Sequence, residues 1–267
     1  GNTMLSFLFF IVCFLASTIG AVCGIGGGVV IKPVLDAIGA LDVDAVSFLS
    51  GCTVLSMTAY SVLAGKVHGN SAIKKSTGIP LSLGAATGGL LGKWLFSYLL
   101  TLSSDKNKVG AVQAACLMLV TIGTLIYTLY KNRVRGLHVK NRFCCVIIGV
   151  ALGIMSSFLG IGGGPINLIV LFYFFSMPTK MATENSLYII FFSQTASLLS
   201  SVSTGNIPQF SAEILILMIA GGIGGGICGR ALNKKLTGKT VDKLFIGMLV
   251  VIILICIYNI HKFLVVI

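Results

Sequence analysis

Two copies of the string Gly-Ile-Gly-Gly-Gly carry the strongest chemical signal in this sequence. They occupy Gly24–Gly28 and Gly160–Gly164, an offset of 136 in a chain of 267 residues. Each copy interrupts an apolar stretch, where a glycine cluster breaks the helix and exposes backbone amides. A helix that begins after such a turn directs its N–H groups and its positive dipole end toward the turn. This pattern favours a bound anion.

Short apolar runs follow both strings, Val29–Ala40 and Pro165–Ser176, and are predicted to be half-helices. Pro165 suits a first helical position, which needs no N–H donor. If the two halves are inverted copies, both helix ends can converge on one small oxyanion. The alternative is that the glycines only permit close helix crossing. The glycines assigned to the predicted binding site are Gly26, Gly27, Gly28, Gly162, Gly163 and Gly164.

Polar residues in and after the half-helices complete the predicted site. They are Asn167, Ser50, Thr183, Asn185 and Ser186. Hydroxyls and amides can replace the hydration shell of an anion, but they also form hydrogen bonds between membrane helices, which is the commoner role for any one of them. Glu184 is either a helix cap or a proton acceptor for coupled transport.

The composition places these residues in a membrane. Hydrophobic residues make up 56% of the chain and charged residues 10%, with a mean hydropathy of +1.01. We therefore expect an all-α, multi-pass protein of the cell membrane, in contact with lipid. The net charge of +12 resides in short loops between apolar runs, so it predicts membrane topology and no nucleic-acid partner. The runs long enough to span hydrocarbon are roughly 4–22, 45–64, 79–100, 109–130, 143–159, 186–202, 214–232 and 244–260.

The chain divides into two repeats, residues 1–130 and 143–267, joined by a basic linker at 131–142. Each repeat is expected to contain four main membrane helices, with a glycine-broken first region and a half-helix. The similarity extends beyond the glycine strings, because Gly84, Gly88, Gly92 and Lys93 match Gly221, Gly225, Gly229 and Arg230 at an offset of 137. Small residues at every fourth position let membrane helices approach closely, so packing is the expected role of this series.

The distribution of Lys and Arg indicates how the halves are oriented. If both halves point the same way, the two sides of the membrane carry nine and ten basic residues, which is no bias. If each glycine break reverses the chain, fourteen of the 19 lie on the side of the linker. Because cytoplasmic loops are enriched in Lys and Arg, the count favours an inverted repeat with a cytoplasmic linker.

Signatures of enzymes are missing from the sequence. There is no HExxH, no nucleophile elbow and no pair of carboxylates within the spans. Val29 occupies the position of the third glycine in a dinucleotide-binding fingerprint. The eight cysteines and three histidines lack metal-ligand spacing. We therefore expect neither enzymatic activity, nor a cofactor, nor a bound metal.

With these residues in place, the chain resembles the TauE/SafE family of anion exporters. The resemblance rests on Gly24–Gly28 followed by Pro33, on Gly160–Pro165, on Ala182–Ser186, on Gly205-Asn206 and on Gly229-Arg230. It covers roughly residues 5 to 262 and implies a transporter of sulfur-containing or organic anions, with its site at the paired glycine regions. Glu184-Asn185 departs from the small residues that the resemblance implies at this place.

These observations predict a secondary transporter that exports a small sulfur-containing anion, such as sulfite or sulfoacetate. It would work by alternating access around the paired glycine breaks, with proton coupling through Glu184. The alternatives are an anion-selective channel and a membrane receptor or scaffold. The sequence makes no prediction of the oligomeric state.

Overall fold

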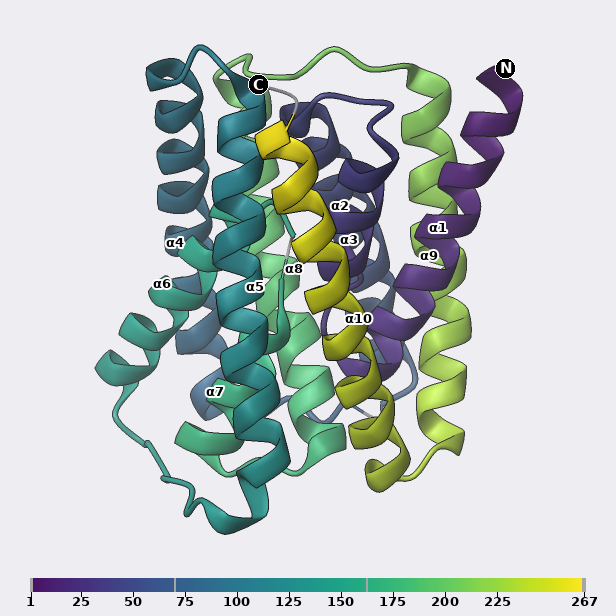
Figure 1. Cartoon of the computed structure of the whole chain (residues 1–267). Helices are drawn as coiled ribbons and strands as arrows, with labels where there is room; N and C mark the ends of the chain where they lie inside the picture. The colour runs from purple at the N-terminus through teal and green to yellow at the C-terminus, as the bar shows by residue number, and fades with distance from the viewer. Residues whose placement is uncertain (1, 70, 162, 266–267) are drawn as a thin grey trace.

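The computed structural model describes residues 2–69, 71–161 and 163–265, and these residues contain helices but no strand (Figure 1). The all-α expectation is therefore confirmed. The helices are α1 (Asn2–Cys23), α2 (Gly28–Ile38), α3 (Val43–Val67), α4 (Lys75–Leu102), α5 (Lys106–Tyr130), a 3₁₀ turn (Lys131–Arg133), α6 (Arg142–Phe158), α7 (Pro165–Phe175), α8 (Thr179–Ser203), α9 (Ala212–Lys235) and α10 (Gly238–Val265).

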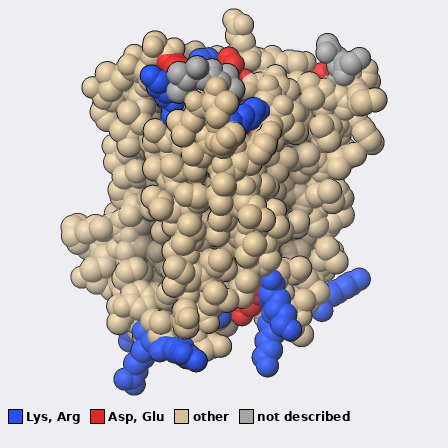
Figure 2. All heavy atoms as spheres, in the orientation of Figure 1, with Lys and Arg blue, Asp and Glu red and all other residues tan. Residues whose placement is uncertain are grey.

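Six of these helices, α1, α3, α5, α8, α9 and α10, are long and apolar enough to cross a membrane. Helices α6 and α7 are apolar but shorter. Helix α4 has 28 residues but is not among the six, because glycines and Lys93 interrupt its apolar residues. Figure 2 shows charged side chains gathered at the two ends of the molecule, with an uncharged band between them. Because hydrocarbon requires such a band, these features support a multi-pass membrane protein.

The first glycine string lies in a turn that reverses the chain. Helix α1 ends at Cys23 and α2 begins at Gly28. A Cβ atom at Gly27 would lie 3.1 Å from the carbonyl oxygen of Ala16, so the chain folds back onto α1. The second string separates α6 from α7 in the corresponding place. Helices α2 and α7 have 11 residues each, close to the predicted half-helices.

Each half packs its fourth helix on the first helix of the other half: α4 contacts α6, and α9 contacts α1. The glycine series makes this approach possible. A Cβ at Gly88 would lie 2.9 Å from the backbone nitrogen of Ile154 on α6, and one at Gly221 would lie 3.0 Å from the carbonyl oxygen of Phe10 on α1. The packing role expected for this series is thus confirmed, because a larger residue would force the helices apart.

The N-terminus and the linker after α5 lie at opposite ends of the bundle (Figure 1). Consequently α1 and α6, which occupy equivalent positions in the two repeats, begin from opposite ends. The equivalent helices α3 and α8 contact each other, as do α5 and α10. Residues of α3 and α8 also contact the glycine turns in the interior of the molecule.

Candidate functional site

The two glycine turns differ in backbone conformation. In the first turn, Gly24, Gly26 and Gly27 have φ angles of 78°, 86° and 78°, in the left-handed region. A side chain at any of these positions would strain the backbone, which explains why glycine occupies all three. In the second turn, Gly160 has a φ of 66°, whereas Gly164 has an extended backbone with φ of −169°. Gly162 lies outside the described residues.

The two turns meet in the interior. A Cβ atom at Gly28 would overlap the carbonyl group of Ile161 in the second turn. Gly26 and Gly163, one from each turn, both face the side chain of Ile190 on α8. Because Ile161 and Ile190 are buried, with exposures of 2% and 1%, apolar side chains fill the contact between the turns. The two glycine turns therefore contact each other, and the side chains between them are apolar.

Polar residues of each half contact the turn of the other half. On α8, the Ser186 hydroxyl donates a 2.6 Å hydrogen bond to the carbonyl oxygen of Gly24, and Thr183 packs beside the same glycine. On α3, the hydroxyl of Ser47 lies beside Gly160. Ser50, three residues further along α3, is fully buried, and its hydroxyl has no hydrogen-bond partner among the described residues. Hydroxyl-bearing residues of α3 and α8 therefore lie beside the first glycine of each turn, Gly160 and Gly24.

The two predicted asparagines have different surroundings. Asn167, in the first turn of α7, is 1% exposed, and its amide oxygen has no partner among the described residues. Asn185 instead binds the α3–α4 connection. Its amide nitrogen donates to the carbonyl oxygen of Ala72 at 3.2 Å, and its amide oxygen accepts from the backbone nitrogen of Lys74 at 3.3 Å. The structure thus brings Asn185 to a loop and not to the glycine turns.

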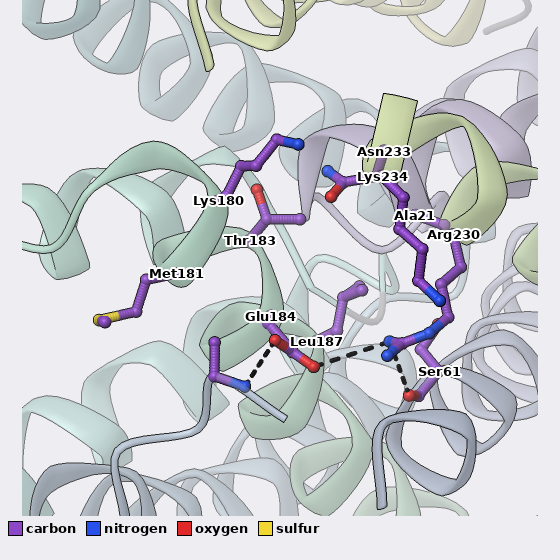
Figure 3. Close-up of a pocket in the computed structure, with 11 residues that line it drawn as sticks. Ala21, Ser61, Lys180, Met181, Thr183, Glu184, Leu187, Arg230, Asn233 and Lys234 are labelled. Atoms are coloured by element: carbon purple, nitrogen blue, oxygen red, sulfur yellow. Dashed lines mark hydrogen bonds and ion pairs between the residues drawn. The ribbon is translucent and has the colours of Figure 1, made fainter. Parts of the chain in front are cut away.

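Glu184 forms an ion pair with Arg230, with 3.7 Å between the carboxylate and the guanidinium group (Figure 3). The carboxylate also accepts a 2.8 Å hydrogen bond from the backbone nitrogen of Ala72, and Arg230 donates one of 3.2 Å to the carbonyl oxygen of Ser61. Because α8 begins at Thr179, Glu184 lies beyond its first turn. The helix-cap interpretation of Glu184 is therefore wrong.

The Glu184–Arg230 pair lies in a cavity of about 310 Å³, which we name the linker-side cavity. The name reflects its position near the basic linker, since Lys131 at the linker's start bonds to Thr179. Its lining holds three basic side chains and one acidic side chain, so its net charge is positive. The lining residues are Ala21, Ser61, Ala72, Lys180, Met181, Thr183, Glu184, Leu187, Arg230, Asn233 and Lys234.

The positive charge of this cavity suits an oxyanion. The planar guanidinium of Arg230 can donate two parallel hydrogen bonds to two oxygens of one anion. Lys180 and Asn233 provide further donors. Thr183 lines the cavity and also packs beside Gly24, so the cavity adjoins the first glycine turn.

A second cavity occupies the equivalent position in the other repeat but measures only about 20 Å³; we name it the distal cavity. Positions 136 or 137 residues apart correspond, so Ser47 matches Thr183 and Lys93 matches Arg230. The distal cavity has bulky aromatic rings where the linker-side cavity has polar side chains. Its lining residues are Ser47, Phe48, Gly51, Lys93, Phe96, Ser156, Ser157, Gly160, Gln194, Ser197 and Leu198.

Arg230, Lys180 and Asn233 are residues that the sequence-based site omitted. Arg230 follows the glycine series of the second half, as Lys93 follows that of the first, so each repeat ends this series with a cation. The recurrence of a cation at this place could have indicated a functional role. That both cations line cavities was not predictable, because most of the other lining residues come from helices distant in the sequence.

Comparisons with known proteins support the interpretation of this chain as a membrane transporter. The model of the sulfite exporter TauE/SafE family matches residues 9–255, which include both glycine turns. A curated relative, the probable membrane transporter protein YunE of Bacillus subtilis (strain 168), is 26% identical over 256 residues, which cover 89% of this chain and 92% of the relative. No solved structure matches the chain.

Proposed function

The chain belongs to the sulfite exporter TauE/SafE family, and from that premise we propose that it is a secondary transporter exporting a small sulfur-containing anion such as sulfite or sulfoacetate. The observation that carries the proposal is the linker-side cavity, where Arg230, Lys180 and Lys234 surround a space beside a glycine turn. Binding in this cavity, followed by passage through the centre of the molecule, would move an anion across the membrane.

The route we propose runs past the two glycine turns. Its proposed lining consists of Gly26–Gly28, Gly163 and Gly164, with Ser50, Asn167, Thr183 and Ser186 as polar contacts. Two buried oxygens that have no partner among the described residues, on Ser50 and Asn167, are consistent with groups that engage a ligand during transport. Asn185 contributes indirectly, by holding the loop that also contacts Glu184.

The two cavities support alternating access as the proposed mechanism. The linker-side cavity is open while its counterpart is nearly closed, the asymmetry expected of one end state of a transporter. Two features support an inverted repeat. Helix α1 packs on α9 and α4 packs on α6, and the equivalent helices α1 and α6 begin at opposite ends of the molecule. With the 131–142 linker in the cytoplasm of the cell, this state receives its anion from inside.

Glu184 is our candidate for proton coupling. Its carboxylate and an incoming anion compete for Arg230, because both are negative and the guanidinium has a limited set of donors. Protonation of Glu184 would release Arg230 for the anion. Transport of a proton with the anion would then follow.

The test is flux into and out of liposomes containing the purified protein, measured for sulfite, sulfate, thiosulfate and sulfoacetate with and without a proton gradient. We expect saturable flux of at least one of them. Arg230→Gln should raise the KM about tenfold or more, because it removes a charge-assisted hydrogen bond of about 1.5–3 kcal/mol.

Lys243→Gln is the matched control, since Lys243 is an exposed residue of α10 that does not line the cavity. Equal KM values for Arg230→Gln and Lys243→Gln would refute the cavity as the anion site. Non-saturating flux with single-channel currents would identify a channel instead.

A further inference from the structure

A separate cluster of buried polar groups lies between α2, α5 and α10. Lys32 and Asp36 form an ion pair on α2, with side-chain exposures of only 3% and 5%. Leu168 and Phe172 occupy the equivalent positions of α7, 136 residues later. The pair is therefore no part of the repeated framework. Because buried charges in membrane helices are costly, they commonly mark ion pathways.

Three oxygen atoms of this cluster make no hydrogen bond to any described residue: Oδ1 of Asp36, Oε1 of Gln113 and Oδ1 of Asn259. Their residues are at least nine-tenths buried and line a single cavity of about 10 Å³, together with Lys32. Three unpartnered acceptors at one small cavity indicate that the cavity accommodates a ligand that interacts with oxygen.

The orientation of the two amide groups follows from their hydrogen bonds. Nε2 of Gln113 donates to the carbonyl oxygen of Phe158 at 2.9 Å, and Nδ2 of Asn259 donates to that of Pro33 at 2.9 Å. A carbonyl oxygen can only accept, so the amide nitrogens must face these carbonyls. The amide oxygens consequently remain available to the cavity.

The number of acceptors distinguishes between ligands. A cavity of about 10–15 Å³ holds one water-sized occupant. A water molecule has two hydrogens for three acceptors, whereas a small cation can be coordinated by all three oxygens. Lys32 already neutralises much of the charge on Asp36. A divalent ion, which needs six or more ligands or keeps several waters, therefore fits less well than a monovalent one.

Asp36 also connects this cavity to the surface. It lines a second cavity of about 260 Å³ beside the α2–α3 connection, together with Asp42, Lys106 and Lys262. Lys106 pairs with Asp42 at 3.4 Å and with Asp44 at 2.9 Å, while Lys262 donates to the carbonyl oxygen of Asp36 at 3.0 Å. Both lysines thus donate to other oxygen atoms and leave Oδ1 of Asp36 without a partner among the described residues.

We propose that Asp36, Gln113 and Asn259 bind a small monovalent cation, Na⁺ or hydronium, which enters through this second cavity. Lys32 links the site to the glycine turns, because its Cε atom lies 3.3 Å from the position of a Cβ at Gly160, and α2 itself begins at the first turn. Coupling of this cation to anion movement rests on the proposed transport function. Binding of the cation does not.

The test is thermal unfolding of the purified, detergent-solubilised full chain while NaCl replaces choline chloride at constant ionic strength, repeated at several pH values. We expect Na⁺ to raise the Tm of the natural protein by several degrees, saturably, because a ligand that binds only the folded state stabilises it. Asp36→Asn and Gln113→Met should lose this rise. Gln113→Met leaves the ion pair intact, so it stays informative if Asp36→Asn fails to fold.

Thr124→Val is the matched control, because Thr124 is a buried polar residue of the same helix as Gln113, outside the cavity. It should keep the full Na⁺ response. If the Tm does not change with Na⁺ but changes with pH, and Gln113→Met abolishes this pH dependence, the cation is hydronium. An equal Na⁺ response in all variants, or no response to either cation, would overturn the proposal.

Flux measurements separate this site from the proposed function. If the natural protein moves no anion in liposomes but its Tm still rises with Na⁺, the proposed transport function is refuted and the cation site is not. Anion flux that neither a Na⁺ gradient nor a proton gradient can drive would refute the coupling alone.

Discussion

The linker-side and distal cavities occupy equivalent positions in the two repeats, yet their volumes are about 310 and 20 Å³. Phe48 and Phe96 of the distal cavity correspond to Glu184 and Asn233 of the linker-side cavity. Phe48 stacks on Phe210 with 5.4 Å between ring centroids, which adds to the closure. The repeated backbone therefore determines where a cavity forms, whereas individual side chains determine how open it is.

The largest effect is expected from a substitution at the contact between the two glycine turns, each of which adjoins one of the cavities. In Gly28→Leu, the new side chain would overlap the carbonyl group of Ile161 and push the two glycine turns apart. Overpacking of this kind costs about 1–3 kcal/mol of stability, and anion flux should fall to background. Gly123→Ala is the control, because a Cβ there meets no atom within 4 Å. Normal flux in Gly28→Leu would show that the contact of the turns is dispensable.

Chemical labelling tests the difference in openness directly. Ser61 lines the linker-side cavity and Ser197, at the equivalent position, lines the distal one. In a variant lacking the eight native cysteines, Ser61→Cys should react with a charged thiol reagent about tenfold or more faster than Ser197→Cys, as a minor state populated at about 10% or less implies. Similar rates would contradict a preferred linker-side-open state.

Replacing one ring should reduce that difference. Phe96→Asn introduces the side chain that the linker-side cavity has at the equivalent position, Asn233. It removes apolar bulk from the distal cavity, so labelling of Ser197→Cys should accelerate several-fold while that of Ser61→Cys slows. Phe143→Asn, which changes an exposed aromatic residue of α6, should leave both rates unchanged. If Phe96→Asn leaves the ratio of the two labelling rates unaltered, the backbone and not this side chain closes the distal cavity.

The smallest effect on stability is expected for Glu184→Gln. The ion pair with Arg230 spans 3.7 Å, and glutamine keeps an oxygen that can accept the hydrogen bond from the backbone nitrogen of Ala72, so the Tm should change little. The KM for the anion should fall a few-fold, because the anion no longer competes with a carboxylate for Arg230. If Glu184 is the proton acceptor, the variant should also lose stimulation by a proton gradient. Unchanged KM and unchanged stimulation would exclude Glu184 from both roles.

Much of the architecture was predictable because it depends on local composition. Apolar runs and glycine strings indicated the membrane helices, the breaks at Gly24–Gly28 and Gly160–Gly164, and the half-helices after them, which the structure places at α2 and α7. The site was less predictable. Thr183 and Ser186 do contact the first turn, but Asn185 contacts a loop, and Arg230 came from a helix that the sequence assigned to packing.

Hydropathy and glycine content act within short segments of chain, so they suffice to predict a helical membrane protein with two repeated glycine breaks. Three other features depend on tertiary packing: each half's polar helix covers the other half's turn, one cavity is open and its counterpart nearly closed, and Asp36, Gln113 and Asn259 share a cavity. Those arrangements join residues up to 226 positions apart. Contacts over such separations depend on helix packing across the whole molecule, which no local pattern encodes.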